Sequence, residues 1–475
     1  MQSLKQQWFG NVRGDILSGI VVALALIPEA IAFSIIAGVD PMVGLYASFI
    51  IAVIIAFAGG RPGMISAATG AMALVIAPLV RDYGLQYLFA ATILTGFIQI
   101  LFGILKIAKL MKFIPNAVML GFVNSLAILI FMAQVPHFIG ISTMTYVFVA
   151  LTLILVYTLP RFIKVIPAPL IAIVLLSVIA IYSGVELRTI GDLGTITQTL
   201  PTFIIPDVPF NLETLRIILP VSISLAIVGL LESLLTSQIV DDMTGTESNK
   251  NREARGQGIA NVINGFFGGM AGCAMIGQSV INVKSGGRGR LSTLIAGLFL
   301  IFLIMVLGEL VVKIPMPVLV GIMVMVSIGT FDWSSFKYLV KAPRTDAIVM
   351  LTTVVIVVWT HDLSKGVIAG VILSAVFFVV KISSVKIKQE GNRYFVSGQL
   401  FFASTDSFVD YFKYNEINRT KIQLDFSNCR IWDESGVGAL VKVQELLREK
   451  GIDVDVVQLD APSKELVSKL QGMVV

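Results

Sequence analysis

Long apolar runs recur through most of this chain, and they restrict what it can fold into. Between Asp15 and about Val380, stretches of roughly 20 residues with few or no charges follow one another. A helix of about this length crosses the hydrocarbon core of a bilayer. Charged residues make up 14% of the chain and mean hydropathy is +0.89, whereas soluble domains carry about 25% charged residues. The sequence therefore predicts an integral membrane protein, followed from Lys381 by a soluble tail.

The predicted fold of residues 1–383 is an all-α polytopic membrane domain with fourteen spans, some of them short. The spans centre roughly on residues 16–36, 43–59, 64–80, 87–105, 114–135, 145–160, 167–183, 217–238, 256–270, 274–286, 291–312, 315–330, 346–360 and 364–380. The first apolar run lacks the cleavage site of a signal peptide, and we interpret it as a retained span.

Positive charge indicates the orientation of the chain. With the N-terminus inside, seventeen of the 35 Lys and Arg residues fall in inner segments, five in outer segments and thirteen in the tail. This bias favours an even number of spans in a cell membrane, with the N-terminus and the tail both cytoplasmic. It also accounts for the net charge of +5, so no nucleic-acid partner is expected.

The two halves of the membrane domain contain a repeated pattern. Ile114-Pro115-x-x-Val118-x-x-Gly121 recurs as Ile314-Pro315-x-x-Val318-x-x-Gly321, and a Gly-Gly pair precedes a short span in each half. Each half holds seven predicted spans, and an odd number requires the second copy to be inverted. Inverted repeats are typical of secondary transporters, whose site lies near the midplane where the repeats meet.

The two corresponding short spans indicate where a site would lie. Residues 63–72 and 272–282 are both rich in small residues, and each can combine a few extended residues with a half-helix. A half-helix that begins inside the membrane directs its amide groups and positive dipole end toward the centre. Two of them from opposite sides would form an anion cradle. Ordinary close packing of helices through small residues is the alternative.

Two carboxyl groups fall within predicted spans at corresponding places. Glu29 follows Pro28 in the middle of the first span, and Glu232 lies in the eighth. Charged groups in the membrane are costly and usually functional, although a structural or snorkelling role is the alternative. Phe33 and Thr236 follow them by four residues and share their helix faces.

Motifs of catalysis are missing from the sequence. It contains no Walker A motif, no His-Glu-x-x-His, no paired-cysteine metal spacing and no Gly-x-Ser-x-Gly. We therefore expect no enzyme activity, no cofactor and no bound metal. Transport would be driven by a gradient or would be passive.

Residues 386–475 alternate like a small α/β domain. Strands are predicted at 393–396, 422–426 and 454–459, and helices at 437–450 and 463–470. The first helix carries Leu440, Val443, Leu446 and Leu447 on one face.

Several segments together resemble the sulfate permease (SulP) family of anion transporters. They are Ile27-Pro28-Glu29-Ala30-Ile31-Ala32-Phe33, Pro41-Met42-Val43-Gly44-Leu45-Tyr46-Ala47-Ser48, Gly268-Gly269-Met270-Ala271-Gly272 and Asn282-Val283-Lys284-Ser285-Gly286-Gly287-Arg288. In the tail, Leu424-Asp425-Phe426-Ser427 and Asp433-Glu434-Ser435-Gly436-Val437-Gly438 resemble a STAS domain.

The resemblance implies a core domain (spans 1–4 and 8–11) that moves against a gate domain (spans 5–7 and 12–14), usually in a homodimer. It implies substrates such as sulfate, bicarbonate, chloride or dicarboxylates. It also implies that the anion lies between spans 3 and 10, near Glu29, Phe33, Thr69, Met275, Ile276 and Ser279.

This sequence departs from the family pattern at three places. Many relatives carry Gln in place of Glu29, many exchangers carry Arg in place of Gln278, and Glu434 replaces the serine phosphorylated in related antagonists. The more negative site argues against simple chloride exchange and favours a protonatable one. Relatives associated with sodium coupling tend to have Asp where Glu232 stands, with Thr at the place of Thr236.

The leading hypothesis from the sequence is a proton-coupled anion symporter that uses Glu232 and Thr236 for the coupling ion. Sodium coupling, electroneutral exchange and a passive anion channel remain alternatives. A nucleobase transporter, which resembles this chain in span number and repeat, is disfavoured by the STAS-like tail.

Overall fold

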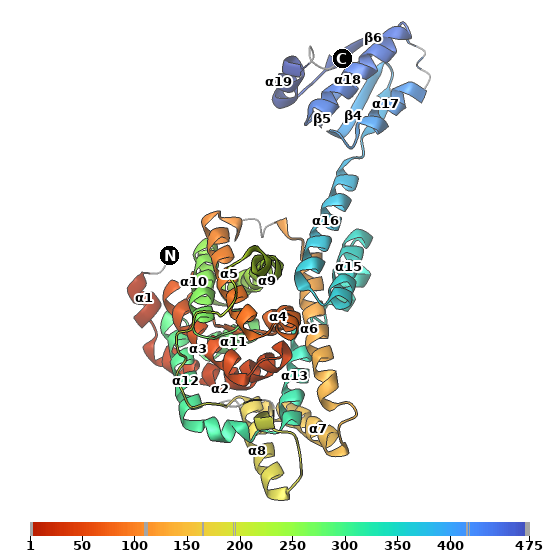
Figure 1. The fold of residues 1–475 in the computed structure, drawn as a ribbon. Helices are drawn as coiled ribbons and strands as arrows, with labels where there is room; N and C mark the ends of the chain where they lie inside the picture. Colours follow the sequence, from red (N-terminus) through yellow and green to blue (C-terminus); the bar gives the residue numbers. More distant parts are fainter. Residues whose placement is uncertain are drawn as a thin grey trace. The chain divides into compact units, whose positions relative to one another are not determined.

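The computed structural model describes residues 3–108, 113–163, 166–192, 194, 196–414, 417 and 419–470. The chain forms two compact units, Met1–Val371 and Ile372–Val475 (Figure 1).

Each of the fourteen predicted spans contains a helix. In the first half these helices are α2 (Val12–Ala37), α3 (Pro41–Ala58), α4 (Gly70–Tyr83), α5 (Leu85–Ile104), α6 (Asn116–Phe138), α7 (Thr143–Thr158) and α8 (Ala168–Ser183). In the second half they are α9 (Leu212–Thr244), α10 (Lys250–Phe266), α11 (Ile276–Lys284), α12 (Arg290–Val312), α13 (Met316–Thr330), α15 (Arg344–Thr360) and α16 (Leu363–Ile382). Among the described residues, nine helices are long and apolar enough to cross a membrane.

Some helix boundaries differ from the prediction. The short helices α1 (Leu4–Phe9) and α14 (Ser335–Lys341) were not predicted. Helix α10 begins at Lys250 rather than at 256, because Glu253 in its charged first turn is buried instead of exposed in a loop. The Glu253 side chain there is fully buried and accepts hydrogen bonds from the backbone N–H groups of Gly60 and Arg61.

The repeated sequence pattern corresponds to repeated packing. Gly121 on α6 lies against Thr353 on α15, and a Cβ added to the glycine would be 2.8 Å from the threonine Cβ. Gly321 on α13 lies against Thr152 on α7 in the same way, at 2.6 Å. Only glycine allows helices to approach this closely. The corresponding glycines of the two halves therefore make equivalent helix contacts.

Two short strands connect the halves at the centre of the unit. Strand β1 (Ser66–Ala68) pairs antiparallel with β2 (Gly272–Ala274), so that Ala67 is opposite Cys273. All six residues are buried. Helix α4 follows β1 and helix α11 follows β2, which confirms the expected combination of extended residues and half-helices.

The helices pack mainly within two groups. The first group consists of α2–α5 and α9–α12, and the second of α6–α8 and α13–α15. Helix α16 joins the second group, because its Gly366 and Gly370 lie against α15 and α6. Buried polar contacts join the two halves within the first group: Arg61 forms an ion pair with Asp241 at 3.4 Å, and Asp15 accepts the backbone N–H of Gly289 at 2.9 Å. In Figure 1, α2, α3, α4 and α11 lie together within the first group.

The second unit is a four-stranded α/β domain. Its sheet has the order β3 (Lys386–Glu390), β4 (Arg393–Leu400), β5 (Lys421–Ile431) and β6 (Asp453–Val457), with β3 antiparallel to β4 and the other pairs parallel. Helices α17 (Thr405–Tyr414), α18 (Glu434–Glu449) and α19 (Ala461–Leu470) follow β4, β5 and β6. All the predicted elements are present, whereas β3 and α17 were missed. Strand β6 ends before the predicted residue 459, because Gln458 has a positive φ of 60°.

Candidate functional site

The two half-helices, α4 and α11, differ in how their N-termini are capped. Thr69 caps α4, because its side chain accepts the backbone N–H of Met72. Met275 occupies the same place before α11 and provides no side-chain cap. The first turn of any helix has backbone N–H groups without partners inside the helix. Helix α11 therefore begins with amide donors that no capping side chain satisfies.

The first turn of α11 is also accessible. Gly277 is exposed, and a Cβ added to it would have no other atom within 4 Å, whereas Ile276 is half-buried. Gly277 leaves room for a small ligand beside the free amide groups. A helix N-terminus with these properties favours an anion.

Glu29 and Phe33 of α2 lie beside the half-helices. The Glu29 carboxyl is within hydrogen-bonding reach of the Gln278 side chain in the first turn of α11. Phe33 is buried, and its ring lies 2.9 Å from the place of a Cβ on Gly70, the first residue of α4. One face of α2 thus connects the starts of both half-helices through Glu29 and Phe33.

The expected anion ligand Ser279 is engaged elsewhere. Its buried hydroxyl accepts the backbone N–H of Ile65 at 3.0 Å, and the Met275 N–H donates to the Ile65 carbonyl at 2.9 Å. These bonds attach the start of α11 to the chain that enters β1. Ser279 therefore holds the half-helices together, and the backbone amides remain the groups available to an anion.

Glu232 on α9 faces the central strands. The residue is 7% exposed, and the thiol of Cys273 on β2 donates a hydrogen bond to its Oε2 at 2.9 Å. The hydroxyl of Thr69 lies 3.2 Å from the Cys273 sulfur. The sequence singled out Glu232 and Thr69 but missed Cys273. The packing of α9 against β2, a contact between segments distant in the sequence, brings this thiol to the carboxyl.

Thr236 lies one helical turn after Glu232 and is fully buried. Its hydroxyl donates to the Glu232 backbone carbonyl at 2.7 Å. The hydroxyl hydrogen is thus used within α9, and only the oxygen lone pairs remain for another partner.

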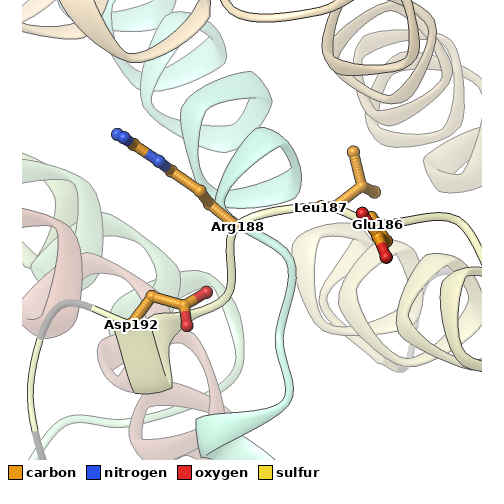
Figure 2. A pocket seen from close by; sticks show the side chains of 4 residues that line it. All are labelled: Glu186, Leu187, Arg188 and Asp192. Carbon is orange, nitrogen blue, oxygen red and sulfur yellow. The ribbon is translucent and has the colours of Figure 1, made fainter.

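A separate pocket of about 600 Å³ lies in the connection between α8 and α9 (Figure 2). Glu186, Leu187, Arg188 and Asp192 line it, and Figure 2 shows the Arg188 side chain extending away from Asp192. Two carboxyl groups and one guanidinium give this pocket no preference for anions. The start of α11 remains the better candidate site.

Each half-helix follows a buried strand, and the two halves make equivalent helix contacts. This arrangement is typical of secondary membrane transporters. The chain belongs to the sulfate permease family, because the model described as "Sulfate permease family" matches residues 12–154 and 142–353. A STAS domain model matches residues 384–471. The protein is therefore an anion transporter with a STAS domain, and not an enzyme.

Curated relatives are similar over most of the chain. "Putative sulfate transporter YbaR" of Bacillus subtilis is 62% identical over 473 residues, which is 98% of this chain and 99% of the relative. "Bicarbonate transporter BicA" of Picosynechococcus is 31% identical over 418 residues, covering 81% of this chain and 73% of the relative.

Two solved structures have the same fold. The transmembrane domain of a cyanobacterial bicarbonate transporter BicA matches with a TM-score of 0.69 and 30% identity, over 76% of this chain and 98% of that one. Murine Slc26a9 in the inward-facing state matches with a TM-score of 0.84 over 98% of this chain and 88% of that one. Its identity is 18%, so this similarity concerns the fold alone.

Proposed function

We propose that this protein is a secondary active transporter that carries a small anion together with a proton across the cell membrane. One observation carries the proposal: two carboxyl groups, Glu29 and Glu232, flank the uncapped start of α11. In the part of the chain that the structure describes, neither carboxyl has a Lys, Arg or His partner.

Electrostatics link the proton to the anion. In a setting of low dielectric, an ionised carboxylate and a bound anion repel each other strongly. A carboxyl group removes the repulsion by taking up a proton, so proton binding and anion binding favour each other. Glu232 is the first choice for this role because it is the more buried of the two groups. Glu29 can share the role.

The anion site would consist of the amide groups at the start of α11, with Met275 and Ile276 on one side and Glu29 and Phe33 on the other. Thr69 and Ser279 orient the half-helices around it. Amide donors suit oxyanions with several acceptor oxygens. Sulfate is the first candidate, from the name of the relative that is 62% identical, and bicarbonate is the second, from BicA. Dicarboxylates have the same kind of acceptor group.

The helix packing supports an elevator-type movement of a core (α2–α5, α9–α12) against a gate (α6–α8, α13–α16). Buried ion pairs and backbone bonds hold the core together, such as those of Arg61, Glu253 and Asp15. Between the described helices of the two groups, the only side-chain hydrogen bond joins Ser224 and Ser364. Few polar bonds would break if the core moved as one body.

The assembly and orientation of the protein are part of the proposal. The gate would form the contact of a homodimer, as the family resemblance implies. The excess of Lys and Arg in the predicted inner segments supports a cytoplasmic N-terminus and a cytoplasmic STAS domain.

Sodium coupling is the second candidate, because Glu232 and Thr236 could supply oxygen ligands. The Cys273 sulfur beside Glu232 is a poor ligand for sodium and favours the proton.

Uptake by purified protein in liposomes tests the proposal. Labelled sulfate, bicarbonate and fumarate are offered under an inward proton gradient without sodium, and then under a sodium gradient at equal pH. We expect at least one of these anions to be concentrated under the proton gradient. Equilibration without accumulation would indicate a channel, and accumulation only with sodium would exclude the proton as the driving ion.

A further inference from the structure

The Glu232 carboxyl interacts with only a few side chains among the described residues. The structure gives its carboxyl the thiol of Cys273 and the hydroxyl of Thr69 as side-chain partners, and no charged group. Cys273 is 0% exposed and Thr69 is 2% exposed. Helices α4, α5, α10 and α11 and strand β2 pack against α9, which carries this carboxyl. Among their described residues, Cys273 is the only titratable group that interacts with the carboxyl.

A metal cation could not keep its water shell in this place. On the preceding turn of α9, the Met72 side chain lies 2.7 Å and the Gln99 side chain 3.0 Å from the position of a Cβ on Gly229. Glu232 as a whole residue is 7% exposed. A sodium ion would therefore have to be bound mainly by oxygen atoms of the protein.

The hydroxyl groups near Glu232, those of Thr69, Ser233 and Thr236, all take part in hydrogen bonds. Ser233 accepts the backbone N–H of Ala274 at 3.1 Å, and the Thr236 hydroxyl donates within its own helix. On the β2 side, the atom that meets the carboxyl is the Cys273 sulfur. Hard cations prefer oxygen ligands, whereas sulfur suits soft metals. A thiol can still donate to a carboxylate, and it can accept weakly from a protonated carboxyl.

We propose that Cys273 is a positioning residue that makes the Glu232 site selective for protons over sodium ions. It holds the carboxyl by a hydrogen bond, and its sulfur occupies the place where an oxygen would complete a cation site. This inference rests on the proposed role of Glu232 in coupling, and it names the residue that selects the ion.

The test measures thermal unfolding of the purified full-length protein with the sodium ion alone as the probe. Sodium gluconate is compared with choline gluconate at equal ionic strength and pH. A ligand that binds only the folded state raises the melting temperature. We expect no difference for the wild type and a rise on the order of 2 °C in sodium for Cys273→Ser, which supplies an oxygen at the same place.

Three further variants make the result specific. Cys273→Ala removes the sulfur without adding an oxygen and should show no sodium effect. Cys429→Ser, at the buried cysteine of the STAS domain, should behave as the wild type. The double variant Cys273→Ser with Glu232→Gln should lose the sodium effect. If Cys273→Ser does not fold, Cys273→Thr supplies the same oxygen.

Two results would overturn the inference: stabilisation of the wild type by sodium, or folded Ser and Thr variants that do not respond to it. The proposed function is judged separately, by proton-driven uptake of the wild type. Proton-driven uptake together with sodium-insensitive Ser and Thr variants would remove the role of Cys273 and leave proton coupling intact.

Discussion

The hydroxyl groups of Ser224 on α9 and Ser364 on α16 lie 2.9 Å apart, and they form the one side-chain hydrogen bond between described helices of the two groups that we propose as core and gate. Paired cysteines at these positions, Ser224→Cys with Ser364→Cys, should form a disulfide under mild oxidation. If the core moves against the gate, the cross-linked protein should lose transport, and a reducing agent should restore it.

Both single variants are the controls for this cross-link, and each should transport with and without oxidant. The native cysteines Cys273 and Cys429 are buried and unpaired, so they should not compete. Full transport by a protein shown to be cross-linked would contradict a movement between these two helices.

Bulk at the start of α11 should block the anion site. Gly277 faces open space, so Gly277→Leu should fold normally and place a side chain beside the free amide groups. We expect uptake to fall more than about tenfold, which corresponds to about 1.4 kcal/mol. Gly329 near the end of α13 also has open space around it, which makes Gly329→Leu the matched control. Equal uptake by the two variants would place the site elsewhere.

The STAS domain should not determine the substrate. It has its own buried core, which includes Tyr394, Phe408 and Phe426, and it forms a unit separate from the membrane domain. Removal of residues 386–475 should leave a protein that inserts and accepts the same anions, even if its expression or dimerisation suffers. A changed order of preference among sulfate, bicarbonate and fumarate would contradict this division of roles.

Cys429 should resist alkylation in the folded protein. Burial raises the pKa of its thiol to about 12, so at neutral pH the reactive thiolate is scarce. Because the pKa is raised on folding, its contribution to stability is complete below the unfolded value of about 8.5 and is lost as the pH rises toward 12. Maleimide labelling should therefore follow unfolding of the STAS domain, and rapid labelling of native protein at neutral pH would contradict this.

Hydrophobicity predicted the membrane helices, since a long apolar run in lipid can pair its backbone N–H and C=O groups only by forming a helix. The same signal misplaced the start of α10, because Glu253 is buried and paired with the backbone of Gly60. In the tail, β3 was missed because Lys386–Glu390 is a charged, exposed edge strand without alternating apolar residues.

The candidate site was predictable in part. Glu29 and Glu232 stood out because charges in apolar spans are costly, and the half-helices because of their small residues. The partners Cys273 and Gln278 depend on the packing of α9 against β2 and of α2 against α11. Such contacts between distant segments have no local periodicity, so sequence patterns could not reveal them.

Uptake by Glu232→Gln under a proton gradient alone tests the central claim most directly. Gln resembles the protonated carboxyl but cannot release a proton, so the variant should still bind the anion and exchange it across the membrane. It should no longer concentrate the anion when only a proton gradient is imposed, while the wild type does. If Glu232→Gln concentrates the anion as well as the wild type under that gradient, Glu232 is not the proton carrier.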